Sequence, residues 1–422
     1  MSRLDELIEE LCPNGVEYKK LGNIATISRG GSFQKKDYTE NGVPCIHYGQ
    51  IYTYYNLFAA SAISCISEET AKKQKFAEPG DIIMAVTSEN MDDVCKCVAW
   101  LGNKKIAVSG HTAIIHHTID PKYLTYWFHT AMFYQQKTKI AHGTKVIEVA
   151  PAKLADVLLP VPPLPVQREI ARILDNFTEI TKKLTAELEA ELSARKQQYE
   201  YYRNRLLTFD VHGGGTSRTE WRTFGETCFL QAGKAIDAES ISKEKTLEYC
   251  IPCYGGNGLR GYVRKANQKG EKPLVGRQGA LCGNVCFAKG DYYATEHAVV
   301  VTDRGFYNSR FLYHLLVNKN LNQYKTAGAQ PGLSVTKLET ILLPVPEMEI
   351  QNRIADVLDN FDAICTDLNI GLPAEIEARK KQYEFYRDQL LTFAESGETI
   401  LTDRSEERRV GKECRSRWSP YH

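Results

Sequence analysis

The chain has 422 residues, which is enough for two or more domains with cores of their own. Its 43% hydrophobic and 25% charged residues are typical of an ordinary globular protein, and a formal net charge of +1 by itself says nothing about a nucleic-acid partner. No apolar run approaches the roughly 20 residues of a membrane span, and the N-terminus MSRLDELIEELC is too acidic for a secretory signal, so we expect a cytoplasmic protein with no membrane partner.

Residues 1–158 are predicted to form a first globular module. Short runs of β-forming residues, such as NIATI, DIIMAV and HTAIIHH, are separated by Gly, Pro and Asn. One moderate helix is expected around Leu124 to Gln136. This mixture predicts an α+β fold with a mainly antiparallel, twisted sheet.

Residues 159–209 are predicted to form a long helix. Pro165 stands where a first-turn proline is tolerated, and apolar residues then recur every three or four positions as far as Leu206. A run of fours from Ile180 to Leu192 resembles a coiled-coil stutter. About 44 helical residues would span roughly 65 Å, so the apolar stripe needs a partner of similar length.

Residues 210–342 repeat the composition of the first module, with the runs YCIPCY, KPLVG and HAVVVT and one helix expected around Ser309 to Lys325. The stretch CYGGNGLRGYV predicts a hairpin, because Asn257 and Gly258 suit the positive φ angles of a tight turn. The segment has 17 basic and 12 acidic residues, a net charge of +5, so a DNA-binding surface would lie on local basic patches of the globular parts.

Twelve scattered cysteines are typical of buried thiols in a reducing compartment. One group allows a second interpretation, because a C-x2-C followed by a C-x3-C could supply four zinc thiolates. The alternative is that these cysteines act as small apolar residues on strands, and the first module has no matching quartet. The group comprises Cys250, Cys253, Cys282 and Cys286.

Residues 343–393 repeat the long helix. Leu343 to Phe393 aligns with Leu159 to Phe209 without a gap, and 28 of the 51 positions are identical. Fainter matches precede each helix, including SGHTAII around His111 with TEHAVVV around His297. Each unit is therefore a globular module followed by a helix.

The two helices are predicted to pack as an antiparallel coiled coil with one module at each end, which gives the chain a pseudo-two-fold internal repeat. In the second helix Gly371 and Pro373 interrupt the pattern, so we expect a kink there. Homodimeric DNA-binding proteins use the same symmetry to match half-sites about one helical turn apart, with the helices fixing the separation.

Catalytic motifs are absent from the sequence. It contains no G-x-x-x-x-G-K-[ST] phosphate loop, no H-E-x-x-H, and no Asn or Asp before an aromatic-ending Pro-Pro of the kind that amino-methyltransferases use. His111 and His297 recur without an Asp, Ser or Cys at a consistent offset, which favours strand-end packing or phosphate contact over catalysis. The residues themselves therefore indicate neither a catalytic site nor a metal.

The paired segments LPVPPLPVQREIARILDNF and ARKQQYEYYRNRLLTF, with LPVPEMEIQNRIADVLDNF and ARKKQYEFYRDQLLTF, resemble the conserved regions of type I restriction-modification specificity subunits. The resemblance extends from residue 1 to about 393. It implies target recognition domains at 1–158 and 210–342, and central and distal conserved helical regions at 159–209 and 343–393. The remaining 394–422 match neither the repeat nor the family, and their composition predicts a disordered or artefactual extension.

The resemblance also implies a function. Each recognition domain would read one half of a bipartite site in double-stranded DNA, and the helices would set the spacer between the halves. Two modification subunits, which carry the S-adenosylmethionine chemistry, would dock on the helices, and motor-nuclease restriction subunits would join for cleavage. The subunit itself would need no cofactor and would be non-catalytic.

Candidate DNA contacts are polar side chains in turns, because Arg can bind guanine bidentately, Asn or Gln can bind adenine, and Lys mainly meets phosphate. In the first module they are Ser32, Gln34, Lys35, Lys36, Tyr48, Gln50, Ser88, Asn90, His111, Thr144 and Lys145. In the second module they are Asn257, Arg260, Arg277, Gln278, His297 and Gln330. For each of them, simple solvation is the alternative.

Four tyrosines are candidate docking residues for the modification subunits, because aromatic side chains are enriched at protein interfaces. They are Tyr199, Tyr202, Tyr383 and Tyr386, and the alternative is that they only seal the coiled coil. Two other functions remain open at this point: a protein scaffold that does not bind DNA, and a self-contained DNA methyltransferase or nuclease.

Overall fold

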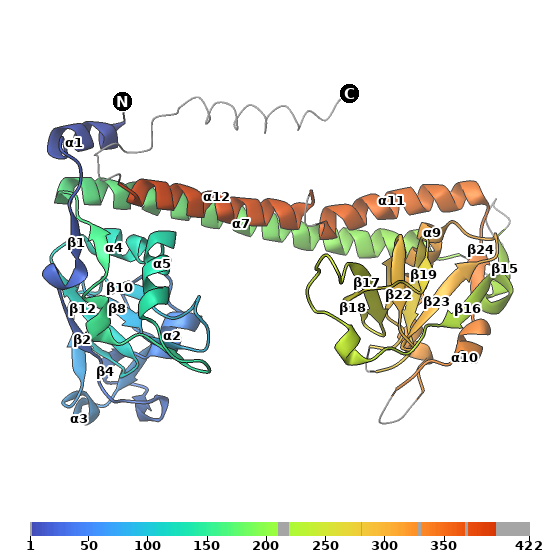
Figure 1. Cartoon of the computed structure of the whole chain (residues 1–422), viewed down its shortest axis with the longest axis horizontal. Coiled ribbons are helices and arrows are strands. Elements are labelled where there is room, and N and C mark those ends of the chain that lie inside the picture. The colour runs from blue at the N-terminus through green and yellow to red at the C-terminus, as the bar shows by residue number, and fades with distance from the viewer. Residues whose placement is uncertain (1, 210–218, 280, 327–330, 368–369, 394–422) are drawn as a thin grey trace. The chain divides into compact units, whose positions relative to one another are not determined.

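The structure is a computed structural model that describes residues 2–209, 219–279, 281–326, 331–367 and 370–393. It divides into two compact units, unit 1 with residues 1–185 and 377–422 and unit 2 with residues 186–376. Figure 1 labels many of the helices and strands of both units. Gln330 and the extension 394–422 lie outside the described residues.

Two five-stranded sheets form the globular part of unit 1. The first sheet holds, in spatial order, β2 (Ala25–Arg29), β12 (Thr112–His117), β8 (Ile82–Ala85), β10 (Cys97–Trp100) and β5 (Phe58–Ala59). The second holds β3 (Tyr38–Thr39), β6 (Ser64–Ile66), β4 (Val43–Ile46), β11 (Ile106–Val108) and β7 (Lys75–Ala77). Only the pairs β10–β5 and β11–β4 are parallel, so the mainly antiparallel arrangement is confirmed.

Strand β8 shows why the two sheets pack together. All four residues of its sequence IIMA are buried, because alternate side chains enter different clusters. Ile82 and Met84 pack with the helices that follow the sheet, whereas Ile83 and Ala85 pack towards residues of the second sheet, such as Val108. An apolar run without alternation is thus a strand covered on both faces.

Short helices and two small ladders complete unit 1. The helices are α1 (Arg3–Leu11), α2 (Tyr48–Thr53), α3 (Glu68–Ala71), α4 (Pro121–Trp127), α5 (Ala131–Ile140) and α6 (Pro151–Leu154), with the 3-10 turns η1 (Leu21–Asn23) and η2 (Lys35–Asp37). The ladders pair β1 (Tyr18–Lys20) with β14 (Leu158–Pro160) and β9 (Thr87–Ser88) with β13 (Ile147–Glu148). The single helix predicted around Leu124 to Gln136 is wrong, because α4 ends at Trp127 and Thr130 caps a new helix, α5, by accepting from the Phe133 N–H.

Unit 2 repeats the same plan with fewer strands. Its first sheet holds β16 (Cys228–Ala232), β23 (Ala298–Asp303), β20 (Lys272–Gly276) and β21 (Val285–Ala288). Its second holds β18 (Gly258–Val263), β17 (Ile251–Gly255), β22 (Asp291–Ala294) and β19 (Gln268–Lys269), and β15 (Glu220–Thr223) pairs with β24 (Leu342–Val345). The helical segments are α8 (Phe224–Thr227), η3 (Ala238–Ser240), α9 (Ser309–Asn318), η4 (Leu321–Tyr324) and α10 (Val335–Glu339).

The two units share strand order and hydrogen bonds. The order β2-β12-β8-β10 in unit 1 corresponds to β16-β23-β20-β21 in unit 2. At the start of the second strand, the Val86 N–H donates to the His111 carbonyl, and the Arg277 N–H donates to the His297 carbonyl. The weak sequence match around these two histidines therefore marks equivalent positions. The predicted hairpin also forms, between β17 and β18, with φ at 91° for Gly258.

The long helices form where the apolar repeats predict them. The first is α7 (Leu164–Leu206), with Pro165 in its first turn. The second repeat is divided into α11 (Met348–Thr366) and α12 (Leu372–Leu391), so the predicted kink is a complete break. Pro373 is the second residue of α12, where its missing N–H would have no helical partner in any case.

Within each unit the helices pair in opposite directions (Figure 1). In unit 1 the Tyr383 hydroxyl lies 2.8 Å from the Thr178 hydroxyl, and the rings of Phe177 and Tyr386 are 6.1 Å apart. In unit 2, Tyr202 stacks on Phe361 with ring centroids 5.6 Å apart. The predicted antiparallel pairing is confirmed in both units.

A polar network joins each globular part to its helices, and in unit 2 it centres on Asp359 of α11. Arg310 of α9 donates to both carboxylate oxygens, and Nε2 of the fully buried His314 lies 2.6 Å from Oδ1. The Tyr199 hydroxyl lies 3.2 Å from the other ring nitrogen of His314. Burial lowers the pKa of His314, and the hydrogen bond to Asp359 partly offsets this shift.

The equivalent network in unit 1 has a more exposed cation. Asp175 stands 184 positions before Asp359 and accepts from Lys122 Nζ at 2.5 Å and from the Tyr126 hydroxyl at 2.8 Å. The two carboxylates are similarly exposed, Asp175 to 32% and Asp359 to 35%, but Lys122 is 37% exposed where Arg310 is 20% exposed. Water can therefore replace the lost partner of Lys122 more readily.

We expect Asp359→Ala to lower the free energy of unfolding by about 2 kcal/mol and Asp175→Ala by about half of that, because only the former leaves a buried imidazole and a guanidinium without their acceptor. Urea denaturation of the two variants beside the unaltered chain measures the difference. Equal losses would show that the burial of the basic partners does not matter.

Candidate nucleic-acid interface

Unit 1 contains a hollow of about 690 Å³ where the chain leaves β2 and enters β12. We call it the first groove. Its lining residues are Arg29, Gly30, Gly31, Ser32, Phe33, Gln34, His47, Tyr48, Lys73, Lys75, Ser109, Gly110 and His111. They include three fixed cations and no Asp or Glu, so the described lining suits a polyanion.

Aromatic rings and imidazoles form one wall of the first groove. The Tyr48 ring lies 4.5 Å from the His47 ring and 5.0 Å from the His111 ring. Burial lowers the pKa of His47, and its electrostatic interactions with Lys35 and His111 lower it further. The rings are tilted against one another, and aromatic faces beside cations are a common platform for bases and backbone phosphates.

Several residues predicted from the sequence meet at this groove. Ser32, Gln34, Tyr48 and His111 line it. Lys35 and Lys36 are exposed and are the first two residues of η2. Gln50 differs, because it is buried, donates to the Ser64 hydroxyl at 2.5 Å and accepts from the His47 N–H at 2.8 Å. A contact between Gln50 and a base would have to break both hydrogen bonds.

The other predicted residues of unit 1 lie beside the groove, on the ladder of β9 and β13. Ser88 ends β9, and the exposed Thr144 and Lys145 precede β13. The ladder is tied to the groove, because Thr87 Oγ1 lies 3.3 Å from His111 Nδ1. Asn90 shapes the following turn, since its side chain accepts from the Asp93 N–H.

Arg29, His47, Lys73 and Lys75 line the groove but were not predicted. The cluster KKQK at 72–75 is visible in the sequence, yet nothing local indicates where it folds. Gln74 of that cluster accepts from the Ser32 N–H at 2.7 Å, which brings the lysines next to the loop after β2. This contact over 42 positions and the pairing of Lys75 with Val108 in the second sheet make them part of the groove.

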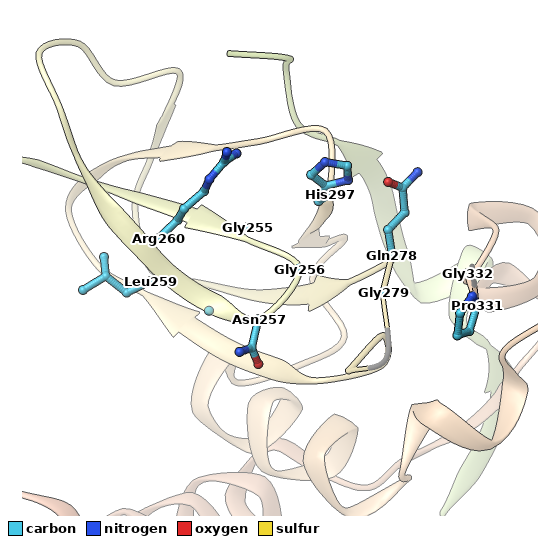
Figure 2. Close-up of a pocket in the computed structure, with 11 residues that line it drawn as sticks. Gly255, Gly256, Asn257, Leu259, Arg260, Gln278, Gly279, His297, Pro331 and Gly332 are labelled. Atoms are coloured by element: carbon cyan, nitrogen blue, oxygen red, sulfur yellow. The ribbon is translucent and has the colours of Figure 1, made fainter. Parts of the chain in front are cut away.

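Unit 2 has a hollow of about 680 Å³ at the equivalent place, which we call the second groove (Figure 2). Its lining residues are Gly255, Gly256, Asn257, Gly258, Leu259, Arg260, Gln278, Gly279, His297, Pro331 and Gly332. Figure 2 shows Arg260, His297 and Gln278 extending from three separate segments towards the same edge, whereas Asn257 points the other way. All four were predicted from the sequence.

Glycines line the floor of the second groove, so its surface there consists of backbone and not of side chains. A Cβ at Gly256 would lie 2.9 Å from the Gln278 carbonyl oxygen, so a side chain there would push the two loops apart. Arg277 is half-buried beside the groove, and its Nε has no hydrogen-bond partner in the described part of the chain. A floor without side chains lets a ligand approach the backbone closely.

The cysteines of unit 2 do not form a zinc site among the residues described, where no group of three or more His, Cys, Asp or Glu side chains could hold a metal. Cys253 and Cys282 are buried, while Cys250 is exposed. Burial raises the pKa of Cys253 to about 11 and that of Cys286 to about 12, so both are protonated thiols at neutral pH.

Each helix pair carries an exposed apolar patch. The first patch, in unit 1, is Phe177, Ile180, Phe385 and the half-buried Tyr386, and the second, in unit 2, is the half-buried Phe361 with Ile364, Tyr201 and Tyr202. The two sets occupy equivalent positions of the 184-residue repeat. The patches therefore have nearly the same chemistry.

The four predicted docking tyrosines fall into two classes. Tyr202 and Tyr386 belong to the patches, whereas Tyr199 and Tyr383 bind His314 and Thr178 inside the polar networks. Burial raises the pKa of both Tyr199 and Tyr383. The sequence alone could not separate these classes.

No helix in the described part of the chain is long and apolar enough to cross a membrane.

Comparison with known proteins agrees with this organisation. The family described as the type I restriction modification DNA specificity domain matches residues 13–193 and again residues 218–378. The specificity subunit of the type I restriction enzyme EcoprrI of Escherichia coli is 35% identical over 379 residues, which cover 87% of this chain and 93% of that protein. The EcoR124I/EcoR124II specificity subunit, also from Escherichia coli, is 31% identical over 301 residues, covering 64% and 70%.

Two solved structures share the fold. One, from work on the complex assembly and conformational transition of the type I R-M system, is 16% identical with a TM-score of 0.65 and covers 90% of this chain and 98% of its own. The HsdS subunit from Thermoanaerobacter tengcongensis is 14% identical with a TM-score of 0.55, covering 90% and 97%.

Proposed function

Because this chain belongs to the type I restriction-modification DNA specificity family, we propose that it is the specificity subunit that directs such a complex to its DNA site. Residues 1–158 and 210–342 are the two target recognition domains, and residues 159–209 and 343–393 are the helical regions. The extension 394–422 has no part in this division. A protein that acts on chromosomal and invading DNA works in the cytoplasm.

One observation carries the proposal: two hollows occupy the same topological place in two copies of one fold, yet different side chains line them. The first groove offers Arg29, Lys73 and Lys75, and the second offers Arg260 and Gln278 beside glycines. Cations supply affinity for the phosphates, whereas Arg, Asn and Gln side chains discriminate base edges. Two different grooves therefore fit a bipartite site whose halves differ in sequence.

The helical regions set the spacer between the half-sites and bind the partner subunits. Two equivalent patches suit two copies of one partner, which we propose to be the modification subunit with its S-adenosylmethionine chemistry. Motor-nuclease restriction subunits complete the complex. The chain itself supplies recognition and no catalysis.

Sequencing of the methylated sites in cells that carry this gene and its modification partner tests the proposal. We expect a split motif, and exchange of residues 1–158 for those of a related subunit should change one half only. A change in both halves together would contradict independent recognition domains. We expect the affinity of the chain for duplex DNA to fall by orders of magnitude between 50 and 200 mM salt.

Two alternatives predict other outcomes. A scaffold without DNA binding would show no salt-dependent association with duplex DNA, and the cationic lining of the first groove speaks against it. A self-contained methyltransferase would transfer a methyl group to DNA without any partner subunit. Incubation of the purified chain with S-adenosylmethionine and DNA distinguishes that activity from the proposed role.

A further inference from the structure

In both units, one hairpin connection carries residues that face or adjoin the groove. Residues 86–96 join β8 to β10 in unit 1 and include the candidate contacts Ser88 and Asn90. In unit 2 the connection from β20 to β21, of which residues 277–279 and 281–284 are described, begins with Arg277 and Gln278. We call these connections the first and second reading loops. Their first residues are held at the grooves, because Thr87 contacts His111 and the Arg277 N–H donates to the His297 carbonyl.

The far end of each loop contains a left-handed residue at the same structural position. Cys95 has a φ of 67° and donates its N–H to the Ala85 carbonyl at 2.8 Å. Gly283 has a φ of 89° and donates its N–H to the Gly276 carbonyl at 2.7 Å. Ala85 and Gly276 are the last residues of the equivalent strands β8 and β20, so the two loops close in the same way.

A side chain from the helical segment after the sheet binds the carbonyl just before each left-handed residue. In unit 1, Lys137 Nζ donates to the Val94 carbonyl at 2.8 Å and to the Asp92 carbonyl at 3.0 Å. In unit 2, Asn322 Nδ2 donates to the Cys282 carbonyl at 2.6 Å. Two unrelated side chains thus make the same contact in the two copies of the fold.

The contact is stronger where the backbone is more strained. A non-glycine residue is strained in the left-handed region, whereas glycine adopts it freely. Unit 1, with Cys95, uses a charged donor that is only 5% exposed and lies 4.8 Å from the Tyr134 ring. Unit 2, with Gly283, uses a neutral amide. A Cβ at Gly283 would lie 2.3 Å from the Asn322 backbone nitrogen, so the close approach of η4 also requires glycine.

We propose that Lys137 and Asn322 are positioning residues for sequence readout, each fixing the reading loop of its own recognition domain. The inference rests on the proposed function, because it assumes that the reading loops contact DNA. Neither residue touches the groove itself. Each one satisfies a carbonyl that would otherwise be free to rotate, so the loop keeps one conformation at both ends, and its polar side chains meet base edges in one geometry.

The test uses the complete complex with modification subunits and a library of sites in which one half is varied at a time. We expect Lys137→Met to reduce discrimination at the half read by the first domain by about 10-fold, while discrimination at the other half stays within 2-fold. Asn322→Leu should give the opposite pattern. Lys139→Met is the matched control, because it makes the same change at an exposed position of the same helix and should alter neither half.

Rescue separates positioning from general stability. Cys95→Gly removes the strain that Lys137 offsets, so Lys137→Met combined with Cys95→Gly should recover most of the lost discrimination. Thermal unfolding and the salt dependence of binding to non-specific DNA should change little in the single variants. If Lys137→Met does not fold, Asn322→Leu tests the same contact independently in the other half.

Three results would overturn the inference: unchanged discrimination in both single variants, a loss that affects both halves equally, or no recovery on adding Cys95→Gly. Failure of the proposed function would look different, because the unaltered complex would then show no split motif at all. The comparison of halves is meaningful only after that motif has been found.

Discussion

Replacing Phe385 and Tyr386 with alanine is expected to reduce the number of modification subunits bound per chain from two to one. Both side chains belong to the first patch, where Phe385 is 60% exposed. Buried aromatic anchors at protein interfaces often contribute about 2 kcal/mol or more each, so the affinity of that one site should fall by about 100-fold or more. The matching change of Tyr201 and Tyr202 should remove the other copy.

Native mass spectrometry of the assembled complex counts the bound subunits directly. Lys380→Ala combined with Lys381→Ala is the matched control, because these residues are exposed on the same helix and their loss removes only a surface ion pair. Helix content must be unchanged, since Tyr386 also packs against Phe177. Retention of two partners by the first variant, or loss of both at once, would refute the separate docking patches.

Replacing Lys73 and Lys75 with alanine is expected to weaken binding to DNA by about 50-fold at 0.1 M salt, whatever the sequence of the site. Both lysines line the first groove and are exposed, and although Lys75 is the first residue of β7, its pairing with β11 is made by the backbone and not by the side chain. If each neutralises one phosphate, the slope of log affinity against log salt concentration should become shallower by about 1.8.

A filter-binding or anisotropy titration at several salt concentrations provides both quantities. Lys104→Ala is the control, because Lys104 precedes β11 at the end of that strand remote from the groove. An unchanged salt slope in the double variant would place the phosphates elsewhere. A change of base preference without a change of slope would instead make the lysines base-reading residues.

The long elements could be predicted because their signals are local. The stripe of α7 and its copy in the second repeat follow from helical periodicity, and the break between α11 and α12 follows from Gly371 and Pro373. The extent of the break was underestimated, and the single helix expected around residues 124–136 is two helices. Helix ends depend on capping contacts such as that of Thr130, which apolar periodicity does not reveal.

The grooves could be predicted only in part. In unit 2, the hairpin residues Asn257 and Arg260 and the glycine-flanked Gln278 were found because turn residues mark exposed loops. In unit 1, Gln50 is of a residue type that can contact a base, but it is buried, because α2 turns its amide towards His47 and Ser64. Lys73 and Lys75 were missed because Gln74 joins them to a loop 42 positions away.

The sequence by itself determined the duplication, the α+β modules and the long helices, since each rests on identity or periodicity within one segment. Only the tertiary structure decided which polar side chains meet. It gathered the loops after β2, before β12 and around Lys73 into one groove. It placed Tyr199 and Tyr383 inside the polar networks and left Tyr202 and Tyr386 on the patches. It also brought Lys137 into contact with the Val94 carbonyl. The physical reason is that backbone propensity acts over a few residues, whereas desolvation and hydrogen bonding join residues that the chain separates widely.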